Sequence, residues 1–290
     1  MVSVLISHRL SEHFYLYSIQ LYVIIILLFL SLPGLLYAHT AGYEEIHCKH
    51  FFYGYPTGTP ATNDLIIRDI YAMSTNDDTK FADWVAFRLD RKTMDRAIKT
   101  KRAWKADPWL DESETLEPGD YKKAFATLKV DRGHQAPLAS FKGSDDWHET
   151  NYLSNITPQK SNLNQGPWRI IEDRVRHLVM SGPVVYVMTG PLYERDTPPL
   201  PSADEPHRVP SGYWKIIALQ TGKSLDSIKT AGFIFDQDTD RNAKIISRLC
   251  SIDAIEAKTG LDFLRELPDN QEERIEKDVD TKWAEIHFLN

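Results

Sequence analysis

A short run of the chain, Asp131-Arg132-Gly133-His134, holds groups that suit phosphate chemistry. It places a permanently charged guanidinium two residues before an imidazole that titrates near neutral pH, and the glycine between them lets the backbone turn. A guanidinium can bind phosphate oxygens through two parallel hydrogen bonds, and a neutral imidazole can take a proton from water. The run therefore indicates hydrolysis of a phosphate ester.

More polar side chains follow in the segment from Asn155 to Arg176. Its first part is rich in asparagine, glycine and proline, as loops are. Pro167 suits the first position of a helix, and Gly166 or Asn164 could cap that helix. We therefore expect a loop that leads into a helix. Residues 129–176 would then form a strand, a loop, a second strand and a helix, in that order.

The expected helix has one apolar face and one polar face. The residues that recur at helical spacing on its apolar face are Trp168, Ile171, Val175 and Leu178. Glu172 and Arg176 are four residues apart, so they are neighbours on the polar face. A surface ion pair would explain these two residues as well, but their position after an asparagine-rich loop favours a place in the phosphate site.

Composition limits the classes of protein that the chain can belong to. With 290 residues and 42% hydrophobic content, it can bury a full core as one large domain or two small ones. The net charge of −7 is unlike that of a tight, sequence-independent nucleic-acid binder. An enzyme that cuts nucleic acid is still allowed, because it needs only a local cationic cleft. Cys48 and Cys250 can form at most one disulfide. His47, Cys48 and His50 lack the second group of ligands that would complete a zinc site.

The first 38 residues have the layout of a secretory signal peptide. A polar start is followed by an almost wholly apolar run at 21–32, a break at Pro33-Gly34 and a small residue at Ala38. The alternative is an uncleaved anchor, because the apolar stretch from Tyr15 approaches the roughly 20 residues that span a bilayer. We expect a secreted or periplasmic protein, with membrane contact only if residues 15–37 stay attached.

The rest of the chain divides into three parts. Residues 39–63 are expected to be an irregular lead-in, 64–269 the main domain, and 270–290 a charged and loosely held tail. The expected strands lie at 65–73, 84–89, 184–189, 213–219 and 229–235, and the expected helices at 118–128 and 251–260. A basic cluster at 99–105 includes Trp104, and it fits either a polyanion contact or a solvated strand.

An ordered series of blocks resembles the secreted DNA/RNA non-specific endonucleases, whose ββα-metal (His-Me finger) core carries a DRGH motif. The blocks are 81–86, 129–140, 151–159, 163–166, 189–196, 210–215 and 235–237. They span roughly residues 60 to 269, so the main domain would be the endonuclease domain. The resemblance implies an α+β fold, in which the ββα-metal core sits on a mixed or antiparallel central sheet flanked by helices. It also implies two disulfides in many members, which two cysteines cannot supply.

The resemblance also implies roles for single residues. His134 would be the general base that takes a proton from the attacking water, and Asn155 a polar residue beside it. Asn164 would be the lone protein ligand of a hydrated Mg²⁺, with Mn²⁺ as a substitute, and Glu172 would hold a metal-bound water. The residues implied to contact the phosphate or the charge that develops on it are Arg102, Arg132 and Arg176. Such sparse ligation suits Mg²⁺, which keeps most of its waters.

The expected function is that of an exported, Mg²⁺-dependent, sugar-non-specific endonuclease. It would hydrolyse DNA and RNA to 5′-phosphate products, and it could act as a homodimer. One alternative is a non-catalytic, membrane-anchored surface protein that binds nucleic acid. The presence of His134, Asn164 and Glu172 together argues against that alternative. The other alternative is a phosphodiesterase for a non-nucleic substrate.

Overall fold

The computed structural model describes residues 46–95 and 101–289. The expected signal peptide or anchor at 1–38 lies outside the described residues, as do 39–45 of the lead-in and 99–100 of the basic cluster. Within the described ranges, the structure has no helix that combines the length and the apolar character needed to cross a membrane.

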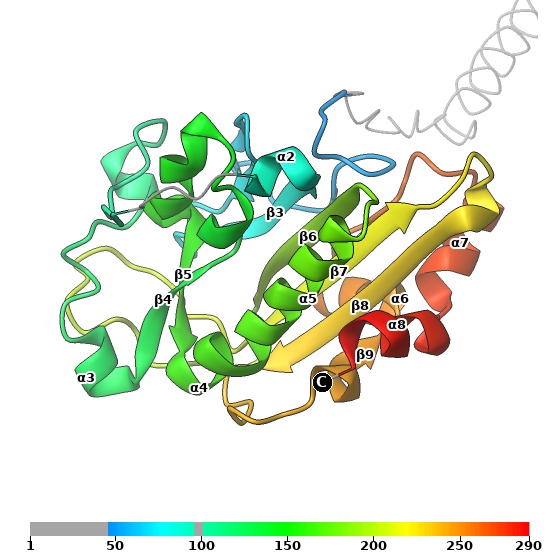
Figure 1. Ribbon diagram of the computed structural model, residues 1–290. Helices are drawn as coiled ribbons and strands as arrows, with labels where there is room; N and C mark the ends of the chain where they lie inside the picture. Colours follow the sequence, from blue (N-terminus) through cyan, green and yellow to red (C-terminus); the bar gives the residue numbers. More distant parts are fainter. Residues whose placement is uncertain (1–45, 96–100, 290) are drawn as a thin grey trace, which may run out of the picture. The chain divides into compact units, whose positions relative to one another are not determined.

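In the described part of the chain, seven strands form one sheet in the order β1-β2-β3-β6-β7-β8-β9. Every neighbouring pair is antiparallel, as expected for this fold class. The strands are β1 (Leu65–Ile67), β2 (Ala72–Thr75), β3 (Ala82–Leu89), β6 (Val185–Leu192), β7 (Gly212–Gln220), β8 (Ile228–Asp236) and β9 (Leu249–Cys250). A separate antiparallel ribbon pairs β4 (Val130–His134) with β5 (Ile156–Lys160). Figure 1 shows this ribbon beside the large sheet, with α5 lying over the sheet.

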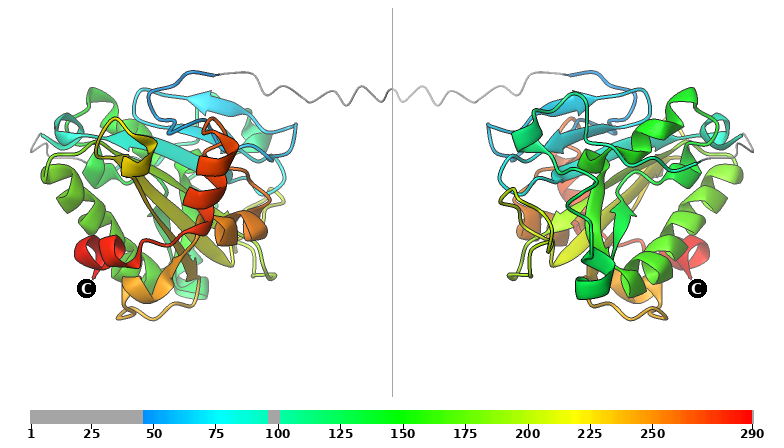
Figure 2. Two further views of the ribbon diagram at one scale, coloured as in Figure 1. Left: turned by 90° about the vertical axis from the view of Figure 1, so that its right-hand side faces the viewer. Right: turned by 90° about the vertical axis from the view of Figure 1, so that its left-hand side faces the viewer.

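Helices cover both faces of the large sheet. Helices α5 and α8 lie on one side, and α6 and α7 lie on the other (Figure 2). The longer helices are α5 (Arg169–Met180), α6 (Ile252–Thr259), α7 (Asp269–Lys277) and α8 (Thr281–Phe288). The described part of the lead-in is irregular, and its Phe52 is buried with α6 and α7. Each face of the sheet therefore has its own hydrophobic core.

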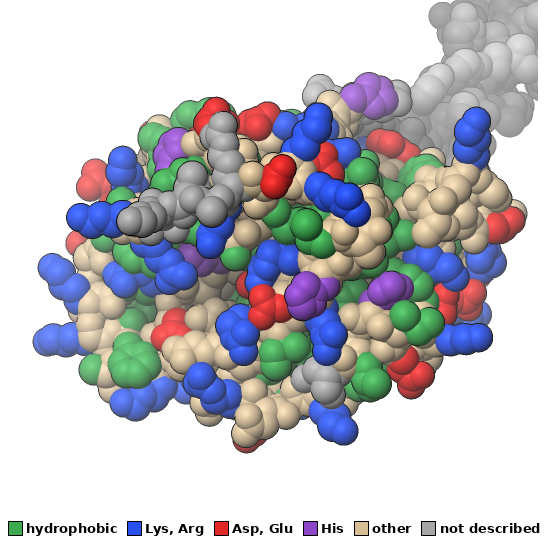
Figure 3. Space-filling model, viewed as in Figure 1, with side chains coloured by type: hydrophobic (Ala, Val, Ile, Leu, Met, Phe, Trp, Pro, Cys, Tyr) green, Lys and Arg blue, Asp and Glu red, His purple; other side chains and the backbone are tan. Residues whose placement is uncertain are grey.

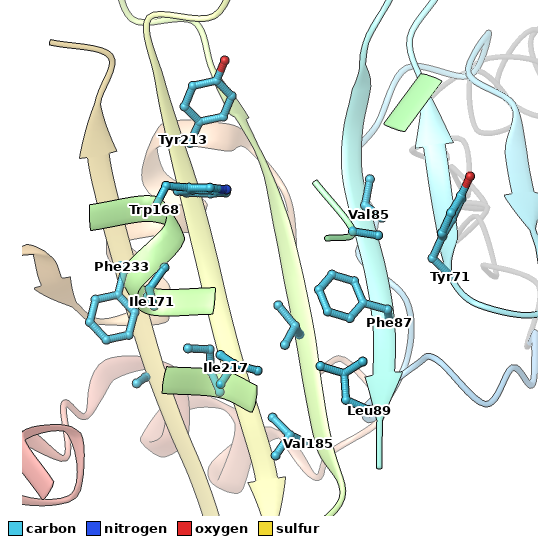
Figure 4. Close-up of a cluster of buried hydrophobic side chains, with 14 of the residues drawn as sticks. Tyr71, Val85, Phe87, Leu89, Trp168, Ile171, Val185, Tyr213, Ile217 and Phe233 are labelled. Atoms are coloured by element: carbon cyan, nitrogen blue, oxygen red, sulfur yellow. The ribbon is translucent and has the colours of Figure 1, made fainter. Parts of the chain in front are cut away.

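The helical periodicity predicted for α5 is confirmed. The four residues expected on its apolar face are all buried, namely Trp168, Ile171, Val175 and Leu178. Trp168 and Ile171 point onto the sheet beside Tyr213 and Phe233 (Figure 4). The Trp168 and Tyr213 ring centroids are 5.5 Å apart. This packing fixes the rotation of α5, and therefore decides which of its side chains face away from the sheet.

Two expected elements are shorter than the sequence pattern indicates. The apolar stretch 65–73 is a hairpin of β1 and β2, because a turn brings the Arg68 amide to the Tyr71 carbonyl at 2.8 Å. The stretch 118–128 becomes helical only at α3 (Ala124–Leu128), after Lys123 adopts a φ of 61°. The expected boundaries of α6 are confirmed, since Ser251 caps its start and Gly260, with a φ of 71°, ends it.

The C-terminal tail is not loosely held, and that expectation was wrong. Residues 269–288 form α7 and α8, and Ile275, Ala284 and Phe288 are buried against the sheet. The Asp280 side chain caps α8 and also accepts a hydrogen bond of 2.6 Å from Lys229. Most of the charged residues of the segment lie on the solvent-exposed faces of α7 and α8. A few widely spaced apolar residues pack these helices onto the sheet.

Short helical turns connect these elements. They are α2 (Arg91–Met94), α4 (Ser161–Leu163), the π-helical turn Asn164–Trp168, and the 3₁₀ turns Glu112–Glu114, Leu138–Ser140, Asp145–Asn151, Leu153–Asn155, Leu225–Ser227 and Ile245–Arg248. Cys48 and Cys250 are both free thiols. Both ring nitrogens of buried His50 face the backbone, at the Arg68 carbonyl and the Arg88 amide, so His50 is a structural residue rather than a metal ligand.

Candidate active site

A cleft of about 700 Å³ lies between the β4–β5 ribbon, α3 and the first half of α5. Six of the predicted site residues line it, namely Arg102, Arg132, His134, Asn164, Glu172 and Arg176. Figure 3 shows Lys and Arg side chains gathered on the side of the molecule that carries β4 and α3. The cleft is thus a cationic hollow on a chain whose net charge is −7.

The β4–β5 ribbon places His134 at the edge of this cleft. Gly133 pairs with Thr157 in the ribbon, and a Cβ atom on Gly133 would lie only 2.7 Å from the Gln159 side chain. A glycine is therefore needed for the two strands to pack with Gln159 between them. With this register, the strand ends with the His134 ring at the cleft.

Asn151 orients the His134 ring. Its Oδ1 lies 3.4 Å from His134 Nε2, and its Nδ2 donates to the His148 carbonyl at 3.2 Å. Since an amide oxygen only accepts hydrogen bonds, Nε2 carries the ring hydrogen, and Nδ1 keeps a free lone pair. Trp104 covers the ring at a centroid distance of 5.4 Å. Burial, and then the positive charge of Arg102, lower the pKa of His134 to about 4. The ring is therefore a neutral base at ordinary pH.

Asn155 does not face the cleft, although the sequence places it beside the base. It is 0% exposed. Its Oδ1 accepts from the Ala136 amide at 2.8 Å, and its Nδ2 donates to the carbonyls of Ala136 and Thr150. It holds the loop that follows His134. Asn151 lies in the same sequence block and makes the contact with the base. The sequence contains Asn151, but it did not show that this asparagine, rather than Asn155, contacts His134. The two side chains are separated by 3₁₀ turns, which have no clear sequence pattern.

A kink before α5 places Asn164. Gly166 adopts φ −105° and ψ −116°, and a Cβ atom on it would lie 2.4 Å from the Arg241 carbonyl oxygen. Helical conformation resumes at Pro167, as the sequence indicates. Asn164 thereby lies at the start of the π-helical turn Asn164–Trp168, before the kink that separates it from α5.

Asp131 fixes the direction of the Asn164 amide. Asn164 Nδ2 donates to Asp131 Oδ2 at 3.0 Å, while Ser161 Oγ donates to Oδ1 at 2.8 Å. Because an ionised carboxylate only accepts, Asn164 must turn its NH₂ group toward Asp131. The carbonyl oxygen of Asn164 is left for another partner, and a hard cation prefers such an oxygen.

Glu172, half-buried at the cleft, and Lys215, buried on β7, act on each other as opposite charges between α5 and β7. Lys215 is 1% exposed, and its Nζ lies 4.3 Å from the centre of the Trp168 ring. Burial raises the pKa of Glu172 and lowers that of Lys215, while each of the two charges favours the ionised form of the other. Lys215 supports Glu172 from the side away from the cleft. The sequence analysis assigned no role to this lysine.

Two arginines keep buried donors without a protein partner. Arg132 lies 4.9 Å from the Tyr121 ring and donates to the Pro118 carbonyl at 3.1 Å, while its Nε is buried and unpaired among the described residues. Arg176 pairs with Asp173 rather than with Glu172, and its Nη1 is likewise buried and unpaired in the described part of the chain. Arg102 is exposed at the same cleft. Phosphate oxygens would satisfy these donors.

Comparisons with known proteins show the family and the fold of the chain. Residues 51–270 match the model of the family described as DNA/RNA non-specific endonuclease. The chain is 44% identical to a nuclease of Serratia marcescens over 83% of this chain and 90% of the relative. It is 28% identical to a nuclease of Nostoc sp. over 80% of this chain and 86% of the relative. A chain in the crystal structure of the EndoG/EndoGI complex has the same fold, with a TM-score of 0.63 at 23% identity over 76% of this chain and 91% of that chain.

Proposed function

Because the chain belongs to the DNA/RNA non-specific endonuclease family and is a nuclease, we propose that it hydrolyses phosphodiester bonds of both DNA and RNA, with Mg²⁺ as cofactor and 5′-phosphates as products. The observation that carries this proposal is the meeting of His134, Asn164 and three arginines at one cleft. In this proposal, residues 64–269 form the catalytic domain.

The residues at the cleft fit a hydrated divalent cation. Asn164 would hold the ion directly through the carbonyl oxygen that Asp131 leaves free, and Glu172 would hold it through a water. The donors are oxygen atoms, as Mg²⁺ requires, and a set of two leaves space for the waters that Mg²⁺ retains. When bound, Mg²⁺ or Mn²⁺ would neutralise phosphate charge and stabilise the leaving oxygen.

His134 would activate the attacking water. Its Nδ1 is the free acceptor of the ring, and Asn151 holds the ring by Nε2. As Nδ1 takes the proton, the ring becomes positively charged, and the carbonyl character of the Asn151 contact helps to stabilise that charge. The low pKa means that the base is available without prior loss of a proton.

The arginines would bind the phosphate. Arg132 and Arg176 carry the unpaired buried donors, so they would contact the oxygens whose negative charge grows during the reaction. Arg102 would contact the substrate backbone at the exposed side of the cleft. Contacts of this kind would reach phosphate and sugar rather than base edges, so the proposed enzyme would cut without sequence preference.

We also propose that residues 1–38 export the protein. The apolar run at 21–32 and the break after it support this proposal. Secretion by cells that carry the full-length chain, with the mature N-terminus read by mass spectrometry, would test it. A mature protein that still begins at residue 1 in the membrane fraction would favour the anchor.

A digestion assay tests the nuclease mechanism. Purified protein is incubated with plasmid, RNA and a small phosphodiester, with Mg²⁺, Mn²⁺ or EDTA. We expect both polymers to be cut only with a metal, and His134→Ala to lose a factor of about 10² to 10⁴ in rate. His177→Ala, which removes an exposed histidine of α5, is the matched control. Cutting of the small diester alone would instead indicate a non-nucleic substrate.

A further inference from the structure

A second group of carboxylates lies on the face of the sheet opposite α5. Asp253 and Glu256 project from α6, and Glu276 projects from α7, with one oxygen of each within 4.8 Å of the others. Figure 2 shows these two helices on the side away from α5, and none of the three residues lines the catalytic cleft. We propose that Asp253, Glu256 and Glu276 bind a structural divalent cation of the Ca²⁺ class, which fastens α7 to α6.

The carboxyl group of Glu276 is buried in this group of acidic residues. The Glu276 side chain is only 7% exposed, and its Oε1 is buried without an N–H or O–H donor in the described part of the chain. The neighbouring Glu256 carboxyl can share a hydrogen bond with it only when one of the two carries a proton. Two ionised carboxylates that meet in a buried place are strongly unfavourable, so the Glu256–Glu276 pair must gain either a proton or a cation.

Among the described residues, no lysine or arginine forms a salt bridge with Glu276. The four charged groups that act most strongly on Glu276 are all carboxylates. In order of their effect they are Glu256, Glu272, Asp262 and Asp253. None of the three proposed ligands forms a salt bridge with a lysine or arginine among the described residues. Burial and these neighbours raise the pKa of Glu276 to about 9. A divalent cation would relieve the burial and the repulsion together.

The donor set favours Ca²⁺ over other metals. All three donors are carboxylate oxygens, which suit a hard cation, and the group lacks the histidine or cysteine that a structural zinc site prefers. Glu256 is already oriented, because its Oε1 accepts from the Phe263 amide at 3.0 Å. Asp253 is exposed and leaves room for waters to complete the six to eight ligands that Ca²⁺ accepts.

The position of the group explains what the ion would stabilise. The turn after α6 is tied to the lead-in, since Thr57 and Asp262 exchange backbone hydrogen bonds of 3.1 and 3.0 Å. Helix α7 is fastened to the same core by Ile275, next to Glu276. An ion held by α6 and α7 would therefore fix the lead-in, the two helices and the sheet as one unit, independently of the cleft.

Thermal unfolding of the full chain with and without Ca²⁺ tests the proposal. We expect Ca²⁺ at about 100 times its dissociation constant to raise the Tm of the wild type by roughly 5 °C or more. Glu276→Gln should lose that part of the shift, and without Ca²⁺ it should be at least as stable as the wild type. Glu273→Gln, an exposed residue of the same helix with the same charge change, should keep the full shift.

Asp253→Asn gives a second variant that disturbs no buried residue, and it should weaken Ca²⁺ binding in isothermal titration calorimetry by about tenfold or more. Any ion at the catalytic cleft contributes equally to all of these proteins, so the differences between them report the α6–α7 group alone. Equal Ca²⁺ shifts in the wild type and Glu276→Gln would overturn the proposal. A wild type with no response to Ca²⁺ would also overturn it, and would leave Glu256 and Glu276 as a pair that shares a proton.

Discussion

Burial lowers the pKa of His134 most, and two neighbours act on the charge of its ring in opposite directions. Arg102 disfavours a positive charge on the ring, while Asn151 accepts a hydrogen bond from it and so favours the charge. Burial adds to the effect of Arg102, and the ring stays neutral to well below the pH at which a free histidine is protonated. In the proposed mechanism, His134 thereby stays available as the base over a wide pH range, although a weaker base takes the proton less readily.

The first prediction concerns the pKa of His134 itself. In the metal-free protein, NMR titration of the imidazole should place this pKa near 4, well below the usual 6.5. Because Arg102 lowers the pKa, Arg102→Ala should raise it. Protonation removes the base, so the acid limit of activity should move to higher pH in the same variant. A wild-type value near 6.5, or a value unchanged by Arg102→Ala, would contradict this account.

The second prediction concerns the orientation of Asn164. Asp131→Asn replaces a group that only accepts by one that can also donate, so the Asn164 amide is free to turn its NH₂ group toward the ion. We expect the Mg²⁺ concentration for half-maximal activity to rise by about 10- to 100-fold. Ser161→Ala removes a different hydrogen bond to Asp131 and should change it much less. Similar effects from both variants would mean that Asp131 only stabilises the fold.

At the level of elements, the sequence predicts best where one pattern controls the structure. The period of Trp168, Ile171 and Val175 gives α5 and its buried face, because the sheet requires a continuous apolar stripe there. Helices α7 and α8 were missed because they bury few residues between many charges. Their apolar residues pack on the sheet from far along the chain, which no local window of sequence can reveal.

The same limit applies to the site. His134, Asn164 and Glu172 belong to blocks with a fixed order, so their meeting at one cleft could be expected from the resemblance. The contact between Asn151 and His134 depends on the turn geometry of 145–155, and the pairing of Lys215 with Glu172 depends on how α5 crosses β7. Such contacts between elements become visible only in three dimensions.

The pairing across α5 and β7 leads to the third prediction. Lys215→Met leaves half-buried Glu172 without the opposite charge of Lys215 and should destabilise the protein by about 1 to 3 kcal/mol, the usual cost of leaving a polar group unsatisfied. Adding Glu172→Gln removes the unpaired charge and should restore most of that stability. Urea unfolding of the wild type, both single variants and the double variant measures the coupling. Losses that simply add would show that the two side chains do not interact.

At the scale of the whole molecule, the charge is divided between two regions. The chain carries a net charge of −7, yet its cleft is lined by Arg102, Arg132, Arg169, Arg176 and Lys142. The acidic residues at α6 and α7 lie on the other side of the sheet. Because the cleft holds more cations than carboxylates, a polyanionic substrate is attracted to it more than to the acidic group at α6 and α7.

This division gives the fourth prediction, which concerns salt. Binding of a long nucleic acid releases counterions, so log kcat/KM should fall linearly with log salt, and each phosphate contact should contribute about 0.7 to 0.9 to the slope. Arg102→Ala should lower kcat/KM most at low salt and make the slope shallower by roughly one contact. Lys223→Ala removes a positive charge from the exposed turn between β7 and β8, and it should leave the slope unchanged. If both variants changed the slope equally, the attraction would come from total charge, and the cleft would have no special part in capturing the substrate.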